Sequence, residues 1–318
     1  MNRNLIMSGV YQNHVPFEDV NHAVQTDPKG LVDECEHIYA CEIERTAQQI
    51  LSGISRSRIV MLAGPSGSGK TTTAKRLCSC LEQHGVKAHT IELDCYYRDV
   101  EHNDPSINYE EPERLDLSLI IEQMDLLSAG EDIWLPKFDF VSEKQHKNVT
   151  HMKLQKDEIA IFEGIHALND IFRQAKANPI DLYISPRLRI IDSDGQILMR
   201  PDELRFIRRG IRDMKYRGAD FHRTLSLWDN VIAGVQAYIM PFKKYADIII
   251  DTSFDYEVNL LAQYAISSLE TIDEGRMTAL EMPHLRERLM RFEPLDPSYV
   301  PENSMLREFF GKIGLEEK

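Results

Sequence analysis

The chain has 318 residues, of which 42% are hydrophobic and 28% charged, a balance typical of one large α/β domain with extensions or of two modest domains. Its formal net charge of -14 argues against nucleic acid as the main partner, because such binders usually carry a basic excess. No run approaches the roughly 18 apolar residues of a membrane span, and the amino terminus lacks the apolar core of a signal peptide, so we expect no membrane partner.

The five cysteines bear on the compartment of the protein. They include no C-x-x-C pair and their number is odd, so neither a zinc framework nor a disulfide framework is expected. Reduced thiols are typical of the cytoplasm, and we expect a cytoplasmic protein. Cys78 and Cys80 fall in a predicted helix, where we expect them to be small fillers of the core or surface.

The first part of the chain precedes any strand signal. Residues 1–30 are polar and show no clear period, and we expect a loose arm there. Residues 31–54 place apolar side chains close to helical spacing, which predicts an amphipathic helix. We therefore assign residues 1–56 to an arm and a helix that packs against the core, with a partner contact as the alternative.

From residue 57 on, short runs rich in Ile, Val and Leu alternate with helical patterns. Such alternation is typical of a mostly parallel sheet with helices on both faces. It assigns residues 57–252 to one α/β domain and residues 253–318 to a helical extension. Strands are predicted at 58–64, 87–94, 158–164, 181–185 and 246–252, and helices at 70–83, 116–128, 203–216 and 226–239.

Residues 64–71 read GPSGSGKT and match the pattern G-x-x-x-x-G-K-[ST] in full. The loop follows a predicted strand and precedes a predicted helix, as a phosphate-binding loop (P-loop) requires. Its glycines let backbone N–H groups turn toward phosphate oxygens, and the helix start adds partial positive charge. We expect a P-loop NTPase fold, with Lys70 on the β- and γ-phosphates of ATP and the Thr71 hydroxyl on Mg²⁺. The nucleotide-binding residues are then Gly64, Pro65, Ser66, Gly67, Ser68, Gly69, Lys70, Thr71 and Thr72.

Two motifs that the chain lacks bear on which class of P-loop protein it is. The chain has no N-K-x-D motif, which a GTPase uses to recognise guanine. The strand at 158–164 ends in Glu and Gly rather than in the Asp-Glu pair of a motor ATPase. Both absences favour a small-molecule kinase.

Carboxylates follow two predicted strands, at the sheet edge where α/β proteins bind ligands. Asp94 is expected to accept a proton from the acceptor hydroxyl, with metal binding or a loop cap as alternatives. Glu163 is expected to bind Mg²⁺ directly or through water, with a helix cap as the alternative.

The segment RFIRRGIRDMKYR at residues 205–217 is basic in an acidic chain. Arg205, Arg208 or Arg209, and Arg212 recur at helical spacing and share a face. On a closing lid they would neutralise the charge of the transferred phosphoryl group. The alternative is a solvated helix face.

Several segments in order resemble the phosphoribulokinase/uridine kinase family over roughly residues 57–252. They are GPSGSGKTT, LDCYYRD, NYEEPERLD, PKFDF, IFEGIH, RRGIRDMKYRG and PFKKYADIII. The nearest resemblance is to bacterial uridine kinase-like nucleoside kinases, where TLSLWDNVIAG and PENSMLREFFG also have counterparts. The resemblance implies an ATP- and Mg²⁺-dependent kinase that phosphorylates the hydroxyl of a small molecule, in first place the 5′-hydroxyl of a nucleoside.

The resemblance also implies residue roles at the acceptor site. Asp94 falls on the catalytic aspartate, Tyr97 on an acceptor-site aromatic and Arg212 on an acceptor-site arginine. Asp116 falls on the carboxylate that holds the ribose hydroxyls, and one carboxylate can accept from two vicinal hydroxyls.

The segment that would read the base departs from the family pattern. Phe138 replaces a Tyr, and Glu143 stands where a His is usual. Phe138 still offers a ring that can stack on a base, but no hydroxyl. Another nucleoside, a sugar phosphate or another alcohol therefore stays open as the acceptor, as does a nucleotide-binding regulator without turnover. An apolar stripe at residues 228–239 is typical of core packing or of a homo-oligomer contact.

Overall fold

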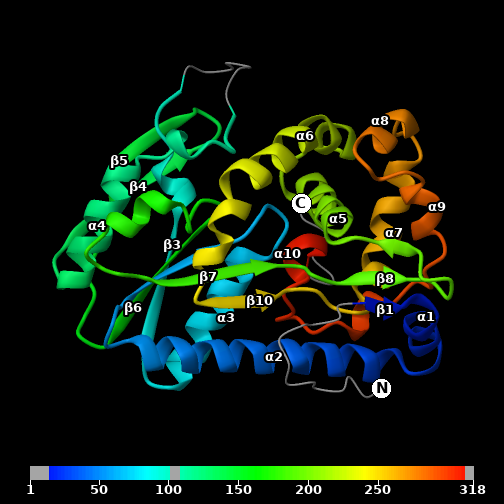
Figure 1. Cartoon of the computed structure of the whole chain (residues 1–318), viewed down its shortest axis with the longest axis horizontal. Coiled ribbons are helices and arrows are strands. Elements are labelled where there is room, and N and C mark those ends of the chain that lie inside the picture. The colour runs from blue at the N-terminus through cyan, green and yellow to red at the C-terminus, as the bar shows by residue number, and fades with distance from the viewer. Residues whose placement is uncertain (1–13, 101–107, 312–318) are drawn as a thin grey trace.

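The computed structural model describes residues 14–100 and 108–311. Its centre is a five-stranded sheet in the order β10-β7-β2-β6-β3, in which all neighbouring strands run parallel (Figure 1). The predicted parallel sheet is confirmed, since each strand lies within one residue of a predicted range. The strands are β2 (Ile59–Ala63), β3 (Lys87–Glu92), β6 (Glu158–Gly164), β7 (Ile180–Ser185) and β10 (Ile248–Asp251).

Helices cover both faces of this sheet, as predicted. Side chains of β2 alternate between the two faces, so Leu62 packs in one apolar core and Met61 in another. The first core includes side chains of α2 (Pro28–Gly53) and α3 (Lys70–Gln83), and the second includes those of α4 (Leu117–Ala129). Figure 1 shows α2 running along one edge of the whole molecule.

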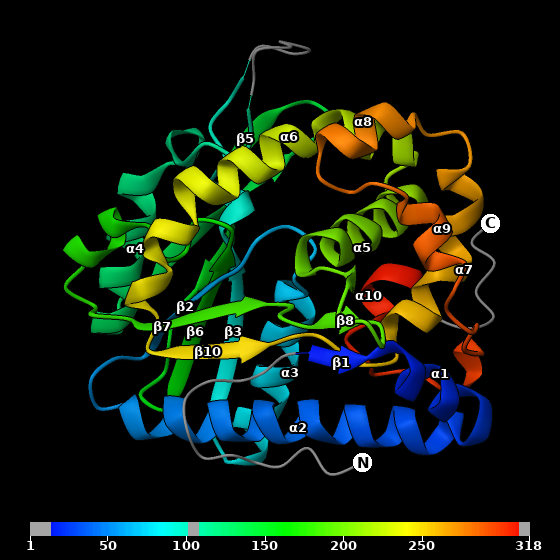
Figure 2. The same ribbon diagram turned by 45° about the vertical axis from the view of Figure 1, so that its right-hand side comes forward.

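The remaining helices gather beyond the carboxyl ends of the strands. They are α5 (Pro201–Tyr216), α6 (Phe221–Tyr238), α7 (Glu257–Leu269), α8 (Glu274–Ala279), α9 (Leu285–Leu289) and α10 (Arg307–Phe310). In both ribbon views α10 returns from the end of the chain to lie against α5, close to α3 (Figure 2). Among the described residues, no helix combines the length and the apolar character needed to cross a membrane.

The expectation of a loose arm is wrong for residues 14–30, whereas residues 1–13 lie outside the described part. β1 (His14–Pro16) pairs in parallel with β8 (Arg189–Ile191), which pairs in turn with β9 (Ile197–Met199). α1 (Phe17–Thr26) then buries Val20 and Val24. Phe17 meets Phe292 edge to face at 5.0 Å, so the partners of this segment lie far away in the sequence.

The sequence also did not predict a hairpin of β4 (Ile133–Asp139) and β5 (Lys144–Met152). The side chains of β5 are mostly exposed and polar, so its hydrophobic signal is weak. Short 3₁₀ helices complete the chain, among them η1 (Leu93–Tyr96) directly after β3 and η4 (Met240–Tyr245) after α6. The hairpin carries Phe138 and Glu143, and η1 carries Asp94 with Tyr97 directly after it.

Candidate active site

The phosphate loop lies between β2 and α3, as predicted. The chain leaves β2 after Ala63 and enters α3 at Lys70. Gly67 and Gly69 have φ angles of 79° and 84°, in the left-handed region that glycine adopts without strain. A Cβ on Gly67 would lie 2.8 Å from the carbonyl oxygen of Arg205, so a side chain has no room there. The loop leads into the first turn of α3, whose N–H groups lack intrahelical partners and suit phosphate.

Two arginines of α5 hold this loop from behind. Arg205 is 2% exposed and donates to the Ser66 carbonyl oxygen at 3.3 Å. Arg208 is fully buried, donates to the Gly67 carbonyl oxygen at 3.2 Å and forms an ion pair with Glu257. The expectation that Arg205 covers the transferred group is wrong, and Arg208 is excluded from its pair of alternatives with Arg209, because both guanidinium groups bind the backbone of the loop.

The other two arginines of the predicted stripe stay partly open. Arg209 pairs with Glu110 at 3.7 Å, and both side chains are mostly buried. Arg212 donates to Asp213 at 2.9 Å, and its positive charge also acts on Asp94. Arg209 also donates to Ser66 Oγ of the loop at 3.2 Å, so Arg212 is the member of the stripe whose charge acts on the candidate catalytic groups Asp94 and Lys70.

The predicted metal ligands lie side by side, Thr71 in the first turn of α3 and Glu163 near the carboxyl end of β6. The Thr71 hydroxyl donates to Glu163 Oε1 at 2.6 Å. Burial raises the pKa of Glu163 to about 7, against the opposing effects of Lys70 and Thr71. Nearby positive charge does not fully offset the burial of the Glu163 carboxylate. This carboxylate and the Thr71 hydroxyl therefore fit Mg²⁺, which prefers hard oxygen ligands.

The Lys70 ammonium group lies among carboxylates. Its Nζ donates to the Pro65 carbonyl oxygen at 3.3 Å. Burial lowers the pKa of Lys70, while the nearby charges of Glu163, Asp94 and Glu308 oppose that shift. The ammonium group thus sits where a nucleotide phosphate, the metal and an acceptor would meet.

Asp94 lies in η1, just past the end of β3. Because β3 and β6 are adjacent and parallel, Asp94 and Glu163 lie at the same edge of the sheet. The Asp94 side chain reaches solvent, yet desolvation by the protein atoms around its carboxyl group raises its pKa. Lys70, Arg217 and Arg212 oppose this shift. The geometry gives Asp94 a position and an environment that suit a proton acceptor.

Four aromatic rings gather beside η1. They belong to Tyr97, Tyr109, Phe138 and Phe140, and the centres of the paired rings lie 5.0 to 6.4 Å apart. Phe138 is only 5% exposed, whereas Phe140 is 55% exposed. The open ring of this cluster is therefore Phe140, which the sequence did not single out, and Phe138 supports it from within.

Hydrogen bonds connect this cluster to Glu143. The Tyr97 hydroxyl donates to the Tyr109 carbonyl oxygen at 2.8 Å, and burial raises the pKa of Tyr97 well above its ordinary value. The Tyr109 hydroxyl donates to Glu143 Oε1 at 3.1 Å. The structure therefore joins Tyr97, Phe138 and Glu143, three of the predicted acceptor-site residues, in one group.

Asp116 begins α4 beside the same cluster. Its backbone N–H donates to the Tyr96 carbonyl oxygen at 2.8 Å. Its Oδ1 accepts from the Leu119 amide at 3.3 Å as a helix cap and lies 3.6 Å from Arg98. The predicted ribose-binding carboxylate thus also has a structural task.

The sequence gave no role to Glu308, which reaches the first turn of α3 from α10. Glu308 Oε2 accepts from the Thr72 backbone N–H at 3.3 Å and from its hydroxyl at 2.7 Å. Met305 covers Gly69 so closely that a Cβ there would lie 2.4 Å from the sulfur. The Glu308 carboxylate therefore accepts a hydrogen bond from the Thr72 N–H, a donor that was predicted to bind phosphate. The segment PENSMLREFFG, which contains Glu308, resembles the family, but its position in the sequence did not indicate a contact with the phosphate loop.

His166 follows β6 and is 1% exposed. Neither ring nitrogen has a hydrogen-bond partner among the described residues. Burial and the charge of Lys70 lower the pKa of His166 to about 4, so the ring is neutral. A neutral, unpartnered imidazole near Lys70 is a group that a bound molecule can satisfy.

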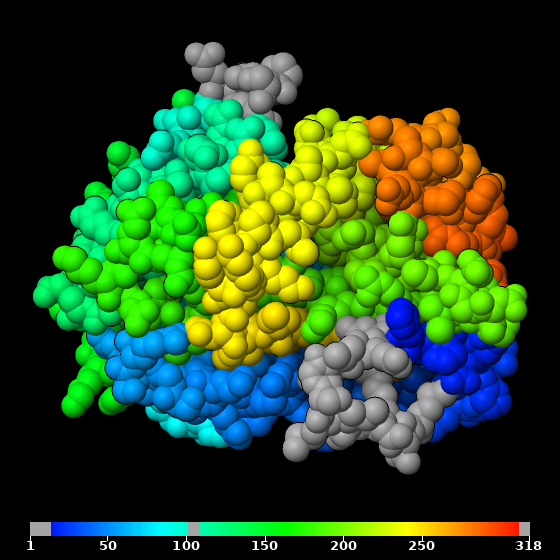
Figure 3. All heavy atoms as spheres, in the orientation of Figure 1, coloured from blue at the N-terminus to red at the C-terminus, as the bar shows by residue number. Residues whose placement is uncertain are grey.

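A cavity of about 350 Å³ opens beside the P-loop on the side of β7. In Figure 3 it belongs to the hollow between the yellow residues of α6 and η4 and the green residues that follow β7. Its wall is basic, with Asp202 as the one acidic residue lining it. The basic lining residues are Arg187, Arg189, Arg200, Arg205 and Lys243.

Several known proteins are similar to this chain. A uridine kinase of Clostridium novyi is 32% identical over 200 residues, covering 61% of this chain and 87% of that protein. A uridine kinase of Oceanobacillus iheyensis is 34% identical, covering 60% and 85%. A solved structure described as a possible uridine kinase from Bacillus stearothermophilus is 18% identical with a TM-score of 0.45, covering 66% of this chain and 97% of that one. The model of the phosphoribulokinase/uridine kinase family matches residues 59–259, and the chain belongs to this family as an ATP-dependent kinase.

Proposed function

We propose that the protein transfers the γ-phosphoryl group of ATP to the 5′-hydroxyl of a nucleoside. The observation that carries this proposal is the convergence of Lys70 and Asp94 beside the aromatic cluster. The first two groups suit phosphoryl transfer, and the cluster offers Phe140 as an open ring for a base. The names of the related uridine kinases support a nucleoside acceptor.

The proposed mechanism relies on positioning and charge. Lys70 and the loop amides hold the phosphates, Asp94 accepts the proton of the attacking hydroxyl, and Arg212 offsets charge on the transferred group. Thr71 and Glu163 would hold Mg²⁺, whose positive charge offsets that of the phosphate oxygens. Asp116 and the aromatic cluster orient the acceptor.

The direct test is an ADP-release assay with ATP and Mg²⁺ over a panel of ribonucleosides, 2′-deoxyribonucleosides, sugar phosphates and other alcohols. We expect turnover with at least one nucleoside. Turnover confined to other acceptors would reject the nucleoside assignment, and ADP release with no acceptor dependence would reject acceptor phosphorylation.

A phosphorylated alcohol is a second candidate acceptor, favoured by the basic cavity beside β7. Its arginine and lysine side chains suit an anionic group. Against it, the cavity lies on the β7 side of β2, whereas Asp94 follows β3 on the other side. The sugar phosphates of the panel decide between the two.

Asp116→Asn is expected to raise the KM for a ribonucleoside by about tenfold or more, because charged hydrogen bonds to the ribose weaken. Asn still caps a helix, so α4 should stay intact. The measurement compares a ribonucleoside with its 2′-deoxy form. A wild-type protein that treats both alike would contradict ribose recognition by Asp116.

Phe138→Tyr with Glu143→His is expected to shift kcat/KM toward uridine or cytidine by more than about tenfold, since a hydrogen-bond partner for the base is gained. Position 143 has a φ of 55°, a left-handed conformation in which His is relatively common. Trp134→Tyr, at the other end of the same hairpin, is the control. An unchanged nucleoside profile would place Phe138 and Glu143 outside the acceptor pocket.

Glu308→Gln is expected to lower the Kd for ATP by roughly two- to fivefold. The change removes a negative charge that competes with phosphate at the start of α3. Nucleotide titration of the variant checks this, with the exposed Glu302→Gln as the control. Weaker binding by the variant would instead mean that Glu308 supports the loop.

A further inference from the structure

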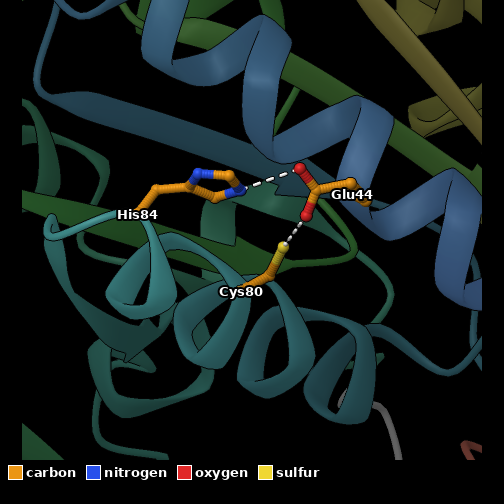
Figure 4. A group of neighbouring side chains, drawn as sticks. All are labelled: Glu44, Cys80 and His84. Atoms are coloured by element: carbon orange, nitrogen blue, oxygen red, sulfur yellow. Dashed lines mark hydrogen bonds and ion pairs between the residues drawn. The ribbon is translucent and has the colours of Figure 1, made fainter.

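A mixed cluster of side chains joins α2 to the second half of α3 (Figure 4). Glu44 comes from α2, Cys80 from α3, and His84 is the residue that directly follows α3. Glu44 Oε2 lies 3.1 Å from Cys80 Sγ, and Glu44 Oε1 lies 2.8 Å from His84 Nε2. Each of the three residues offers one ligand atom, and these ligand atoms lie within 4.8 Å of one another.

We propose that Glu44, Cys80 and His84 bind a divalent transition-metal ion of the zinc class and thereby tie α2 to the helix that carries the phosphate loop. A thiolate, an imidazole and a carboxylate form a ligand set typical of Zn²⁺ and unsuited to Mg²⁺. The expectation against a zinc framework relied on the absence of a C-x-x-C pair and on the odd number of cysteines. The proposed ligand set contains a single cysteine, so that reasoning did not consider it.

The spacing of the ligands supports this site. Cys80 lies in the last turn of α3 and His84 caps that helix four residues later, so their side chains lie about one turn apart on the same side. In a tetrahedral zinc site the ligand atoms lie about 3.3–3.6 Å apart, given bond lengths of about 2.0–2.3 Å. The Cys80–Glu44 and His84–Glu44 separations, each to a different carboxylate oxygen, are shorter than this by about half an ångström. Small rotations of the exposed His84 side chain and the half-exposed Glu44 side chain would lengthen these separations to the values of a tetrahedral site.

The surroundings of the cluster also fit a bound ion. Cys80 is 8% exposed, so the sulfur is protected, while the exposed His84 leaves room for a water molecule as a fourth ligand. Gln48 donates to Glu44 Oε1 at 2.7 Å and orients the carboxylate from outside. Burial and Glu44 raise the pKa of Cys80 to about 11, so metal binding would displace the thiol proton to solvent.

Co²⁺ provides a direct test on the full-length protein. A cobalt–thiolate bond gives a charge-transfer absorption, whereas Co²⁺ at the oxygen ligands Thr71 and Glu163 gives none. We expect one equivalent of Co²⁺ to produce this band and Zn²⁺ to remove it. Cys80→Ser should abolish the band, and His84→Ala should weaken Co²⁺ binding by at least about tenfold.

Cys41→Ser is the matched control. Cys41 Sγ lies 3.5 Å from His37 Nε2 at the same four-residue spacing on α2, but the described residues bring no third such ligand to this pair. The control should bind Co²⁺ as the wild type does. Absence of the band in the wild-type protein, or its persistence in Cys80→Ser, would overturn the proposal.

A melting experiment tests the structural part of the proposal. Zn²⁺ should raise the Tm of the wild type and of Cys41→Ser, because a ligand that binds only the folded state stabilises it. The exposed His84→Ala variant should fold normally and lose this increase. An equal increase in His84→Ala would show that Zn²⁺ stabilises the protein elsewhere and would reject the proposed tie.

Discussion

Lys70→Ala is expected to reduce kcat by at least about 100-fold while the protein stays folded. The ammonium group is placed to offset charge on the transferred phosphoryl group, and loss of one such interaction typically costs two to three orders of magnitude. Within residues 14–100 and 108–311, the ammonium group has one hydrogen bond, to the Pro65 carbonyl oxygen, so the core should tolerate its removal. The measurements are ADP release and thermal melting on the same preparation.

Lys75→Ala is the control for this change, because Lys75 lies exposed on the same helix. It should leave turnover within about twofold of the wild type, as surface substitutions usually do. Activity of Lys70→Ala close to that of this control would reject the assignment of the phosphate loop.

Asp94→Asn is expected to lower kcat by roughly 10²–10⁴ with little change in nucleotide affinity. The substitution keeps the shape of the side chain and removes its ability to accept a proton. Glu92→Gln removes a charge two residues earlier on β3 and is the matched control. An unchanged rate in Asp94→Asn would leave Asp94 as a cap at the end of the strand.

The pH profile gives a second readout for Asp94. Burial raises its pKa, so the carboxylate becomes protonated at a higher pH than an ordinary aspartate. Activity that needs the ionised form should therefore fall, as pH decreases, above the usual range of an aspartate, and this limb should change in Asp94→Asn. A wild-type profile without this limb would contradict the proton-acceptor role.

The central sheet and its helices were predictable because their signals are local. Four of the five strands are short apolar runs, β3 (KAHTIE) being the exception, and α3 begins and ends where its pattern does, at Lys70 and Gln83. The amino-terminal segment was not predictable in this way. Its buried residues pack against parts of the chain that follow more than 150 residues later, as the pairing of Val15 with Ile190 shows.

The candidate site was likewise predictable where its signals are local and unpredictable where it depends on long-range packing. The loop and the pair of Thr71 and Glu163 follow from motif and strand order, because parallel strands bring their carboxyl ends together. The arginine stripe was misjudged in part, since spacing shows which residues share a face but not what that face contacts. The cluster of Glu44, Cys80 and His84 and the contact of Glu308 with α3 form because particular helices lie side by side. The sequence does not show which helices do so.

The cover formed by Met305 and Glu308 has a consequence for the order of synthesis. The five strands are complete at Asp251, whereas the segment that packs on Gly69 comes near the end of the chain. A growing chain therefore has its whole sheet and phosphate loop before it has the residues that cover them. During that interval Gly69 and the Thr72 amide are open to solvent, and a truncation before residue 304 would make this temporary state permanent.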